Sequence, residues 1–272
     1  MTKSITKNRI ATFFEHHTDD SKIMSLFITA GYPDIESTVD LILGMETNGA
    51  DLIELGMPFS DPLADGPTIQ YSSNQAISNG VTMQHIFNMV REVRKQSDIP
   101  IILMGYLNPV MRFGIESFCK QASDAGVDGL IIPDLPPEES ALVEEHSQPN
   151  DLALVYLVAP NTSDERMQLI DSKSQGFVYC VSVTGVTGAR EGDEISRSVN
   201  RFIERVQTNV TKNPKMIGFG IKSHEDAQKI AQHADGFIVG SALINTIRKH
   251  YPEPGWKEKV FDFVKRLKYG KE

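Results

Sequence analysis

The chain has 272 residues, 40% of them apolar, which is enough to bury a large core and lies within the range that one α/β barrel can fill. Its 36 acidic and 27 basic side chains give a net charge of −9, which argues against nucleic acid or an anionic membrane as the main partner. No apolar run approaches the roughly 20 residues of a membrane span. Residues 1–9 are polar and lack the apolar core of a signal peptide. We therefore expect a cytoplasmic protein with a single domain over residues 1–272.

Eight short apolar runs recur along the chain, and each is followed by a segment with helical periodicity. Runs that are apolar on both faces are typical of strands covered on both sides, as in a parallel sheet. The predicted strands are 25–29, 50–55, 99–104, 129–133, 152–158, 177–181, 215–218 and 236–239. Eight strands alternating with helices predict an α/β fold of the (β/α)8 TIM-barrel class, with a doubly wound sheet as the structural alternative.

Additional helical segments are predicted outside this simple alternation. They are an extra N-terminal helix over 8–17, which we expect to plug or flank the barrel, the stretches 68–79 and 82–97, and the C-terminal segment 256–267. A weak internal repeat supports the count of units, because three similar triplets each end a helix and begin a strand. These triplets are 49–51, 126–128 and 233–235, and each closes on an aspartate.

Glu54 interrupts the apolar second strand. Ile53 and Leu55 share one face of this strand, and Glu54 lies on the other face. An ionised carboxylate in such a strand is costly to bury unless it is paired or protonated. Two interpretations stay open: a structural ion pair, or a carboxyl whose pKa is raised by burial, which suits proton transfer near neutral pH.

The loop after this strand carries Asp61 and Asp65 among the prolines Pro58, Pro62 and Pro67. Proline fixes φ, so the loop is stiffened and its acids are held in place. Reactive groups of these barrels lie at the C-terminal ends of strands and in the loops that follow. Each aspartate therefore either caps a turn or takes part in the chemistry.

Three glycine-rich turns follow the last three predicted strands. They are 185–188, 218–220 and the pair Gly240-Ser241. Glycine lets backbone N–H groups approach a phosphate closely, and a helix that begins near Ser241 adds the positive end of its dipole. Phosphate sites built from the last loops recur in this architecture, so we expect a phosphorylated substrate; the alternative is ordinary turn glycines.

Several common catalytic groups are missing from the expected places. None of the seven histidines lies at the end of a predicted strand, and no His-x-x-x-His or Cys-x-x-Cys pair occurs, so no catalytic metal is expected. Lys22 and Lys215 precede their strands, which leaves no Schiff-base lysine at a C-terminal strand end. Cys119 and Cys180 lie in apolar stretches and are expected to be buried rather than joined in a disulfide.

These motifs resemble those of the tryptophan synthase α subunit family. The acid-rich run 52–66, with Thr68-Ile69-Gln70 after it, is the most specific match. Further segments that resemble the family are 28–33, 133–136, 185–189, 218–221 and 240–242. The matches span nearly the whole chain in family order.

The resemblance implies a lyase of tryptophan biosynthesis that cleaves indole-3-glycerol phosphate into indole and glyceraldehyde 3-phosphate. This reverse aldol reaction requires neither a metal nor an organic cofactor in this chain. Indole C3 can be protonated before the bond breaks, because the ring nitrogen can carry the resulting positive charge.

The resemblance also implies roles for particular residues. Glu54 is expected to be the general acid–base, and Asp65 to accept a hydrogen bond from the indole N–H. Phe27 and Tyr179 are expected to line the pocket. The other substrate-binding residues implied are Thr187, Gly188, Phe219, Gly220, Gly240 and Ser241, of which Thr187 helps to close the site.

Finally, the resemblance implies a partner, a pyridoxal-phosphate-dependent β subunit in an α2β2 heterotetramer. Pyridoxal phosphate is then expected only in that partner. The loop with Pro58, Phe59, Asp61 and Pro62 is expected to serve as interface and switch. Three alternatives stay open: a free-standing indole-3-glycerol phosphate lyase, another phosphate-binding barrel such as an isomerase, and a barrel that acts mainly as allosteric activator of its partner.

Overall fold

The structure, a computed structural model of the chain, describes residues 8–17, 22–181, 192–218 and 220–270. Within these ranges, parallel strands form one sheet in the order β5-β4-β3-β2-β1-β9-β8-β7-β6. The strands are β1 Ile23–Thr29, β2 Leu52–Gly56, β3 Ile101–Met104, β4 Gly129–Ile131, β5 Ala153–Val155, β6 Leu157–Val158, β7 Val178–Val181, β8 Lys215–Gly218 and β9 Gly236–Val239. Seven of the eight predicted strands are found as single strands, with ends displaced by no more than two residues.

The sheet closes into a barrel through β5 and β6, which are separated by Tyr156 alone. β5 pairs with β4, and β6 pairs with β7, so the two short strands are halves of one barrel strand. The Tyr156 carbonyl also accepts a hydrogen bond of 3.0 Å from the backbone N–H of Tyr179. The eight-stranded barrel is therefore confirmed, and the doubly wound alternative, which would leave two open edges, is wrong.

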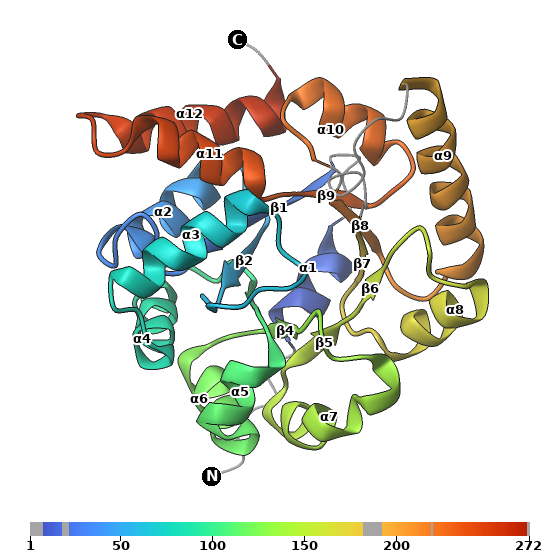
Figure 1. The fold of residues 1–272 in the computed structure, drawn as a ribbon, viewed down its shortest axis with the longest axis horizontal. Helices are drawn as coiled ribbons and strands as arrows, with labels where there is room; N and C mark the ends of the chain where they lie inside the picture. The colour runs from blue at the N-terminus through green and yellow to red at the C-terminus, as the bar shows by residue number, and fades with distance from the viewer. Residues whose placement is uncertain (1–7, 18–21, 182–191, 219, 271–272) are drawn as a thin grey trace.

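A ring of helices surrounds the strands (Figure 1). The described helices are α1 Arg9–His16, α2 Ser37–Thr47, α3 Pro67–Ser78, α4 Met83–Arg94, α5 Leu107–Phe113, α6 Ile115–Ala125, α7 Ala141–Ser147, α8 Asp164–Lys173, α9 Gly192–Asn209, α10 His224–Ala231, α11 Ser241–His250 and α12 Trp256–Tyr269, with short 3-10 helices η1 Pro137–Glu139 and η2 Gln148–Asn150. The predicted additional segments are confirmed as α1, α3, α4 and α12. Cys119 and Cys180 are buried and free, as expected.

Helix α1 closes the N-terminal end of the barrel and appears at the centre of the ring in Figure 1. Ile10 is fully buried and packs among the inward side chains of the strands, including Ile23, Leu52 and Phe177. Asn8 begins the helix, because its side-chain oxygen accepts a hydrogen bond from the Ile10 N–H at 3.0 Å. The N-terminal helix is thus the plug that the sequence left as one of two options.

The internal repeat has a structural cause at this same end of the barrel. Each repeated aspartate makes two hydrogen bonds with one residue near the start of a neighbouring strand. The backbone N–H of the aspartate donates to the carbonyl of that strand residue, and the aspartate carboxylate accepts from the backbone N–H of that strand residue. The pairs are Asp51 with Met24 of β1, Asp128 with Ile101 of β3, and Asp235 with Lys215 of β8, at distances of 2.7 to 3.0 Å. The repeat therefore serves stability at the N-terminal end and not the chemistry at the mouth.

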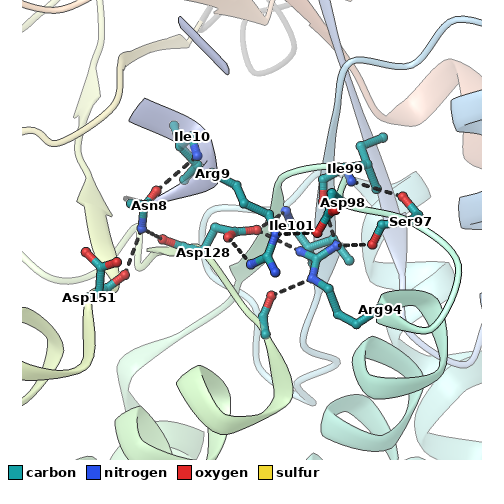
Figure 2. A network of polar contacts seen from close by, with 11 residues as sticks. Asn8, Arg9, Ile10, Arg94, Ser97, Asp98, Ile99, Ile101, Asp128 and Asp151 are labelled. Atoms are coloured by element: carbon teal, nitrogen blue, oxygen red, sulfur yellow. Dashed lines mark hydrogen bonds and ion pairs between the residues drawn. The ribbon is translucent and has the colours of Figure 1, made fainter. Parts of the chain in front are cut away.

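Asp128 is the most buried of the three, with 2% of its surface exposed. Its carboxylate accepts hydrogen bonds from Arg9 of α1 at 3.0 Å and Arg94 of α4 at 2.7 Å. Figure 2 shows both guanidinium groups pointing toward it. Arg94 also donates to the carbonyls of Gly126 and Ile99. This network joins α1, α4, β3 and β4.

We expect Asp128→Asn to lower the free energy of unfolding by about 3 kcal/mol, because it leaves a largely buried guanidinium without its charged partner. Denaturant unfolding at pH 7 measures this loss. The matched control is Asp124→Asn on α6, an exposed aspartate, which should change stability by no more than about 0.5 kcal/mol. If the two variants were equally stable, the network would not hold this end of the barrel together.

Candidate active site

The alternation of side chains along β2 places Glu54 inside the barrel. Ile53 and Leu55 pack outward against the helices, whereas Glu54 lies opposite Phe27 of β1 and Ile102 of β3. None of its surface is exposed. Glu54 takes part in no ion pair among the described residues, so the structural ion pair left open by the sequence is not found there.

Glu54 has two oxygens in different surroundings. Oε1 accepts a hydrogen bond of 2.7 Å from the hydroxyl of Ser25 on β1. Oε2 has no hydrogen-bond partner within the described part of the chain. Burial raises the pKa of this carboxyl from 4.5 to about 7, against a smaller lowering by the Ser25 hydroxyl. A proton on Glu54 is therefore exchangeable near neutral pH.

Asp65 lies on the loop after β2, half-buried at the mouth of the barrel. Burial raises the pKa of its carboxyl to about 6, and a hydrogen bond from the hydroxyl of Tyr106 lowers it. Tyr106 follows β3, and its oxygen also accepts a hydrogen bond from the N–H of Ala64 at 2.9 Å. Asp61 differs: it is exposed, and its carboxylate accepts a hydrogen bond from Ser60 beside it. The two aspartates therefore differ in burial and partners: Asp65 is half-buried and contacts Tyr106, whereas Asp61 is exposed.

Tyr179 and Phe27 fill the upper part of the barrel next to these acids. The pKa of Tyr179 is raised well above its usual range, first by burial and then by the charges of Glu54 and Asp65, so the three groups lie in one region. A Cβ at Gly218 would lie 3.0 Å from the Tyr179 hydroxyl, and a Cβ at Gly56 would lie 2.6 Å from the Phe27 ring. Glycine at these inward positions leaves room for both rings.

A small pocket opens at this end of the barrel. Its lining comes from the upper ends of β1, β2 and β3 and from the residues that follow them. The lining residues are Phe27, Thr29, Gly56, Met57, Pro58, Asp65, Ile69, Ser73, Met104, Gly105, Tyr106 and Pro133. Glu54 is not one of the lining residues: it lies on the same inward face of β2 as Gly56, two residues deeper in the barrel.

The last strand brings a helix N-terminus to the same mouth. Gly240 is the N-cap of α11 and, as a glycine, has no side chain that could cap the helix. A Cβ at Gly240 would lie 3.4 Å from the Cβ of Phe27, which places Gly240 beside the pocket. Ser241 begins the helix and is exposed. Gly220 after β8 has φ +54°, and a Cβ added to it would meet no atom within 4 Å. Free N–H groups at a helix start attract anions.

Three of the predicted substrate-binding residues, Thr187, Gly188 and Phe219, lie outside the described residues. Two residues that the sequence analysis missed, Ser25 and Tyr106, contact the acids directly. Strand alternation could have indicated Ser25, because it shares the inward face of β1 with Phe27.

In the described part of the chain, no group of three or more histidine, cysteine or acidic side chains could hold a metal ion, and none of the helices is long and apolar enough to cross a membrane.

A closed parallel barrel with Asp65 at its C-terminal mouth and Glu54 buried inside has the architecture of the (β/α)8-barrel enzymes, whose active sites lie at this end. The family model described as "Tryptophan synthase alpha chain" matches residues 13–268. The chain belongs to the tryptophan synthase alpha chain family.

Relatives and solved structures agree with this membership. The tryptophan synthase alpha chain of Thermoanaerobacter sp. (strain X514) is 47% identical over 262 residues, which cover 96% of this chain and 98% of the relative. That of Flavobacterium johnsoniae is 45% identical over 255 residues, covering 92% of this chain and 96% of the relative. A crystal structure of the Legionella pneumophila alpha chain superposes with a TM-score of 0.86 at 38% identity, covering 97% of both chains.

Membership confirms the barrel fold and the activity that the motifs implied. The chain is a carbon–carbon lyase of tryptophan biosynthesis, and its reaction is the cleavage of indole-3-glycerol phosphate. The isomerase alternative is therefore wrong.

Proposed function

We propose that Glu54 is the general acid–base of this cleavage. Its protonated carboxyl delivers a proton to C3 of the indole ring, which leaves a positive charge on the ring. The Glu54 carboxylate then takes the proton of the glycerol hydroxyl next to C3. As that carbon becomes an aldehyde, the bond to C3 breaks, and its electron pair restores the neutral indole. The observation that carries this role is a fully buried carboxyl with pKa about 7 and one oxygen without a partner among the described residues.

Asp65 is proposed to stabilise the charged ring. Its pKa of about 6 leaves it ionised at neutral pH, so it can accept a hydrogen bond from the indole N–H and oppose the positive charge. Tyr106, which follows the neighbouring strand β3, holds Asp65 by a hydrogen bond. The two acids thus act at different ends of the ring, one at C3 and one at the nitrogen.

The phosphate is proposed to bind at the start of α11, on the backbone of Gly240 and Ser241, with Gly220 beside them. The glycine N-cap of α11 supports this position, because it has no side chain to cover the backbone N–H groups, and a helix start favours an anion even in a chain of net charge −9. Phe27 and Tyr179 line the pocket for the indole ring. Thr187, Gly188 and Phe219 stay predictions from the resemblance.

We propose a β subunit as partner, in an α2β2 assembly. Two solved structures support this: tryptophan synthase from M. tuberculosis, at 30% identity and a TM-score of 0.84, and the tryptophan synthase complex from Pyrococcus furiosus, at 36% and 0.82. On this chain, Leu63 is 97% exposed on the loop that also carries Pro58, Phe59, Asp61 and Pro62. A β subunit bound at the mouth would cover this exposed apolar side chain. The cytoplasmic location and the single-domain organisation over residues 1–272 stay predictions.

The test is an assay for indole formed from indole-3-glycerol phosphate by the purified chain, with and without a β subunit. We expect indole formation in both cases, a faster rate with the β subunit, and co-elution of the two chains. An unchanged rate without co-elution would favour the free-standing lyase. A chain that accelerates the β subunit but forms no indole itself would favour the activator.

A further inference from the structure

The hydroxyl of Ser25 is the one described hydrogen-bond donor to Glu54. Both side chains are fully buried inside the barrel, and the distance from Ser25 Oγ to Glu54 Oε1 is 2.7 Å. In the strand register, Ser25 lies opposite Leu52 and Phe27 lies opposite Glu54. The serine therefore contacts the carboxyl from the N-terminal side, away from the mouth where substrate enters.

This contact makes the two carboxyl oxygens unequal. Oε1 is held from below, whereas Oε2 has no partner among the described residues and is the oxygen left for substrate. The terminal torsion of a glutamate is broad, so without such a contact the carboxyl plane could turn. A hydroxyl fixed on a neighbouring strand removes that freedom.

We infer that Ser25 is a positioning residue, which holds Oε1 of Glu54 so that Oε2 is the oxygen that transfers the proton. This inference rests on the proposed role of Glu54. The effect is largest in the second half of the reaction, after Glu54 has given its proton to C3. A hydrogen bond to an ionised acceptor is about twice as strong as one to a neutral acceptor, so Ser25 stabilises the carboxylate when it forms.

The other titratable groups around Glu54 come from different elements. Tyr179 of β7 stays neutral at physiological pH, because burial and the nearby acids hold its pKa well above its usual range. Asp65, on the loop after β2, lies near the same tyrosine. Neither of these groups donates a hydrogen bond to Glu54 in the described part of the chain, so the Ser25 hydroxyl is the local group that favours the ionised form of Glu54.

Ser25→Ala tests the inference through a pH profile. Because Glu54 must be protonated to act on C3, kcat of the native chain should fall as pH rises through about 7. Removing the hydroxyl raises the pKa of Glu54 further, so this alkaline limb should move up by about one pH unit. We also expect kcat below the limb to fall about 10-fold, with KM changed less than about twofold, because the phosphate is bound elsewhere. Cysteine is a weaker donor of similar size, so the alkaline limb and the kcat of Ser25→Cys should lie between those of the native chain and of Ser25→Ala.

Ser72→Ala is the matched control. Ser72 of α3 is also fully buried. Its hydroxyl is hydrogen-bonded at 2.7 Å to that of Thr29, which lies on β1 as Ser25 does, and Ser72 has no hydrogen bond to Glu54 among the described contacts. This variant should lose stability without any shift of the limb. A Ser25→Ala profile that keeps the native limb, whether kcat falls or not, would overturn the inference. If Glu54→Gln were active, the proposed function itself would fail, so the two failures are distinguishable.

Discussion

Glu54→Gln is expected to lower kcat for indole formation about 10³-fold, within the range that one general acid–base supplies. Glutamine has nearly the same shape, and its carbonyl oxygen can still accept the hydrogen bond from Ser25. It cannot give a proton to C3 or take one from the glycerol hydroxyl. The loss should therefore appear in kcat, with little change in KM.

Two further measurements make this result specific to the chemistry. Binding of glyceraldehyde 3-phosphate to Glu54→Gln should match that of the native chain, because the proposed phosphate site is the start of α11 and does not include Glu54. The thermal midpoint should not fall, since the substitution removes a carboxyl that is costly to ionise in the barrel. A Glu54→Gln chain within tenfold of the native kcat would exclude Glu54 as the acid–base.

Asp65→Asn is expected to lower kcat about 10²-fold, the effect of removing one electrostatic contact to a charged intermediate. The native carboxyl must be ionised to oppose the charge on the ring, so kcat should decline as pH falls through about 6. Asparagine has no such titration. The acidic limb of the kcat profile should therefore vanish in this variant, while the alkaline limb stays.

The control for this experiment is again Asp124→Asn. Asp124 is exposed and lies near the end of α6, which leads to the N-terminal end of β4, so this variant should keep both limbs of the pH profile and the native kcat. The substrate phosphate also titrates near pH 6, so kcat at saturating substrate must be compared between variants. Retention of the acidic limb in Asp65→Asn would assign that limb to the substrate or to another group.

Much of the fold was predictable because a parallel barrel has a strong local signal. Its strands are apolar on both faces and its helices separate them regularly, so all eight were recognised. The break at Tyr156 was not predictable, because residues 152–158 form one apolar run. The break follows from pairing: one half of the run bonds β4 and the other half bonds β7. Local sequence does not contain that division.

The candidate site, like the fold, was only partly predictable from local sequence. Glu54 was recognisable as a charge in an apolar strand, and its burial follows from alternation. Ser25 carries no such signal, because a small hydroxyl is common in strands, and its importance depends on which carboxyl the barrel brings beside it. Tyr106 lies beyond β3, and its contact with Asp65 forms between segments about 40 residues apart, as the 42-residue separation of Ala64 and Tyr106 illustrates.

Titration of the Glu54 side-chain carboxyl by ¹³C NMR, with the resonance assigned by its absence in Glu54→Gln, measures the key property directly. Burial disfavours the charged form, so the carboxyl should stay protonated below neutral pH and ionise with a midpoint of about 7. The alkaline limb of kcat should then fall at the same pH. A midpoint near the ordinary value of 4.5 would leave Glu54 ionised at neutral pH and without a proton for C3, which contradicts the proposed chemistry.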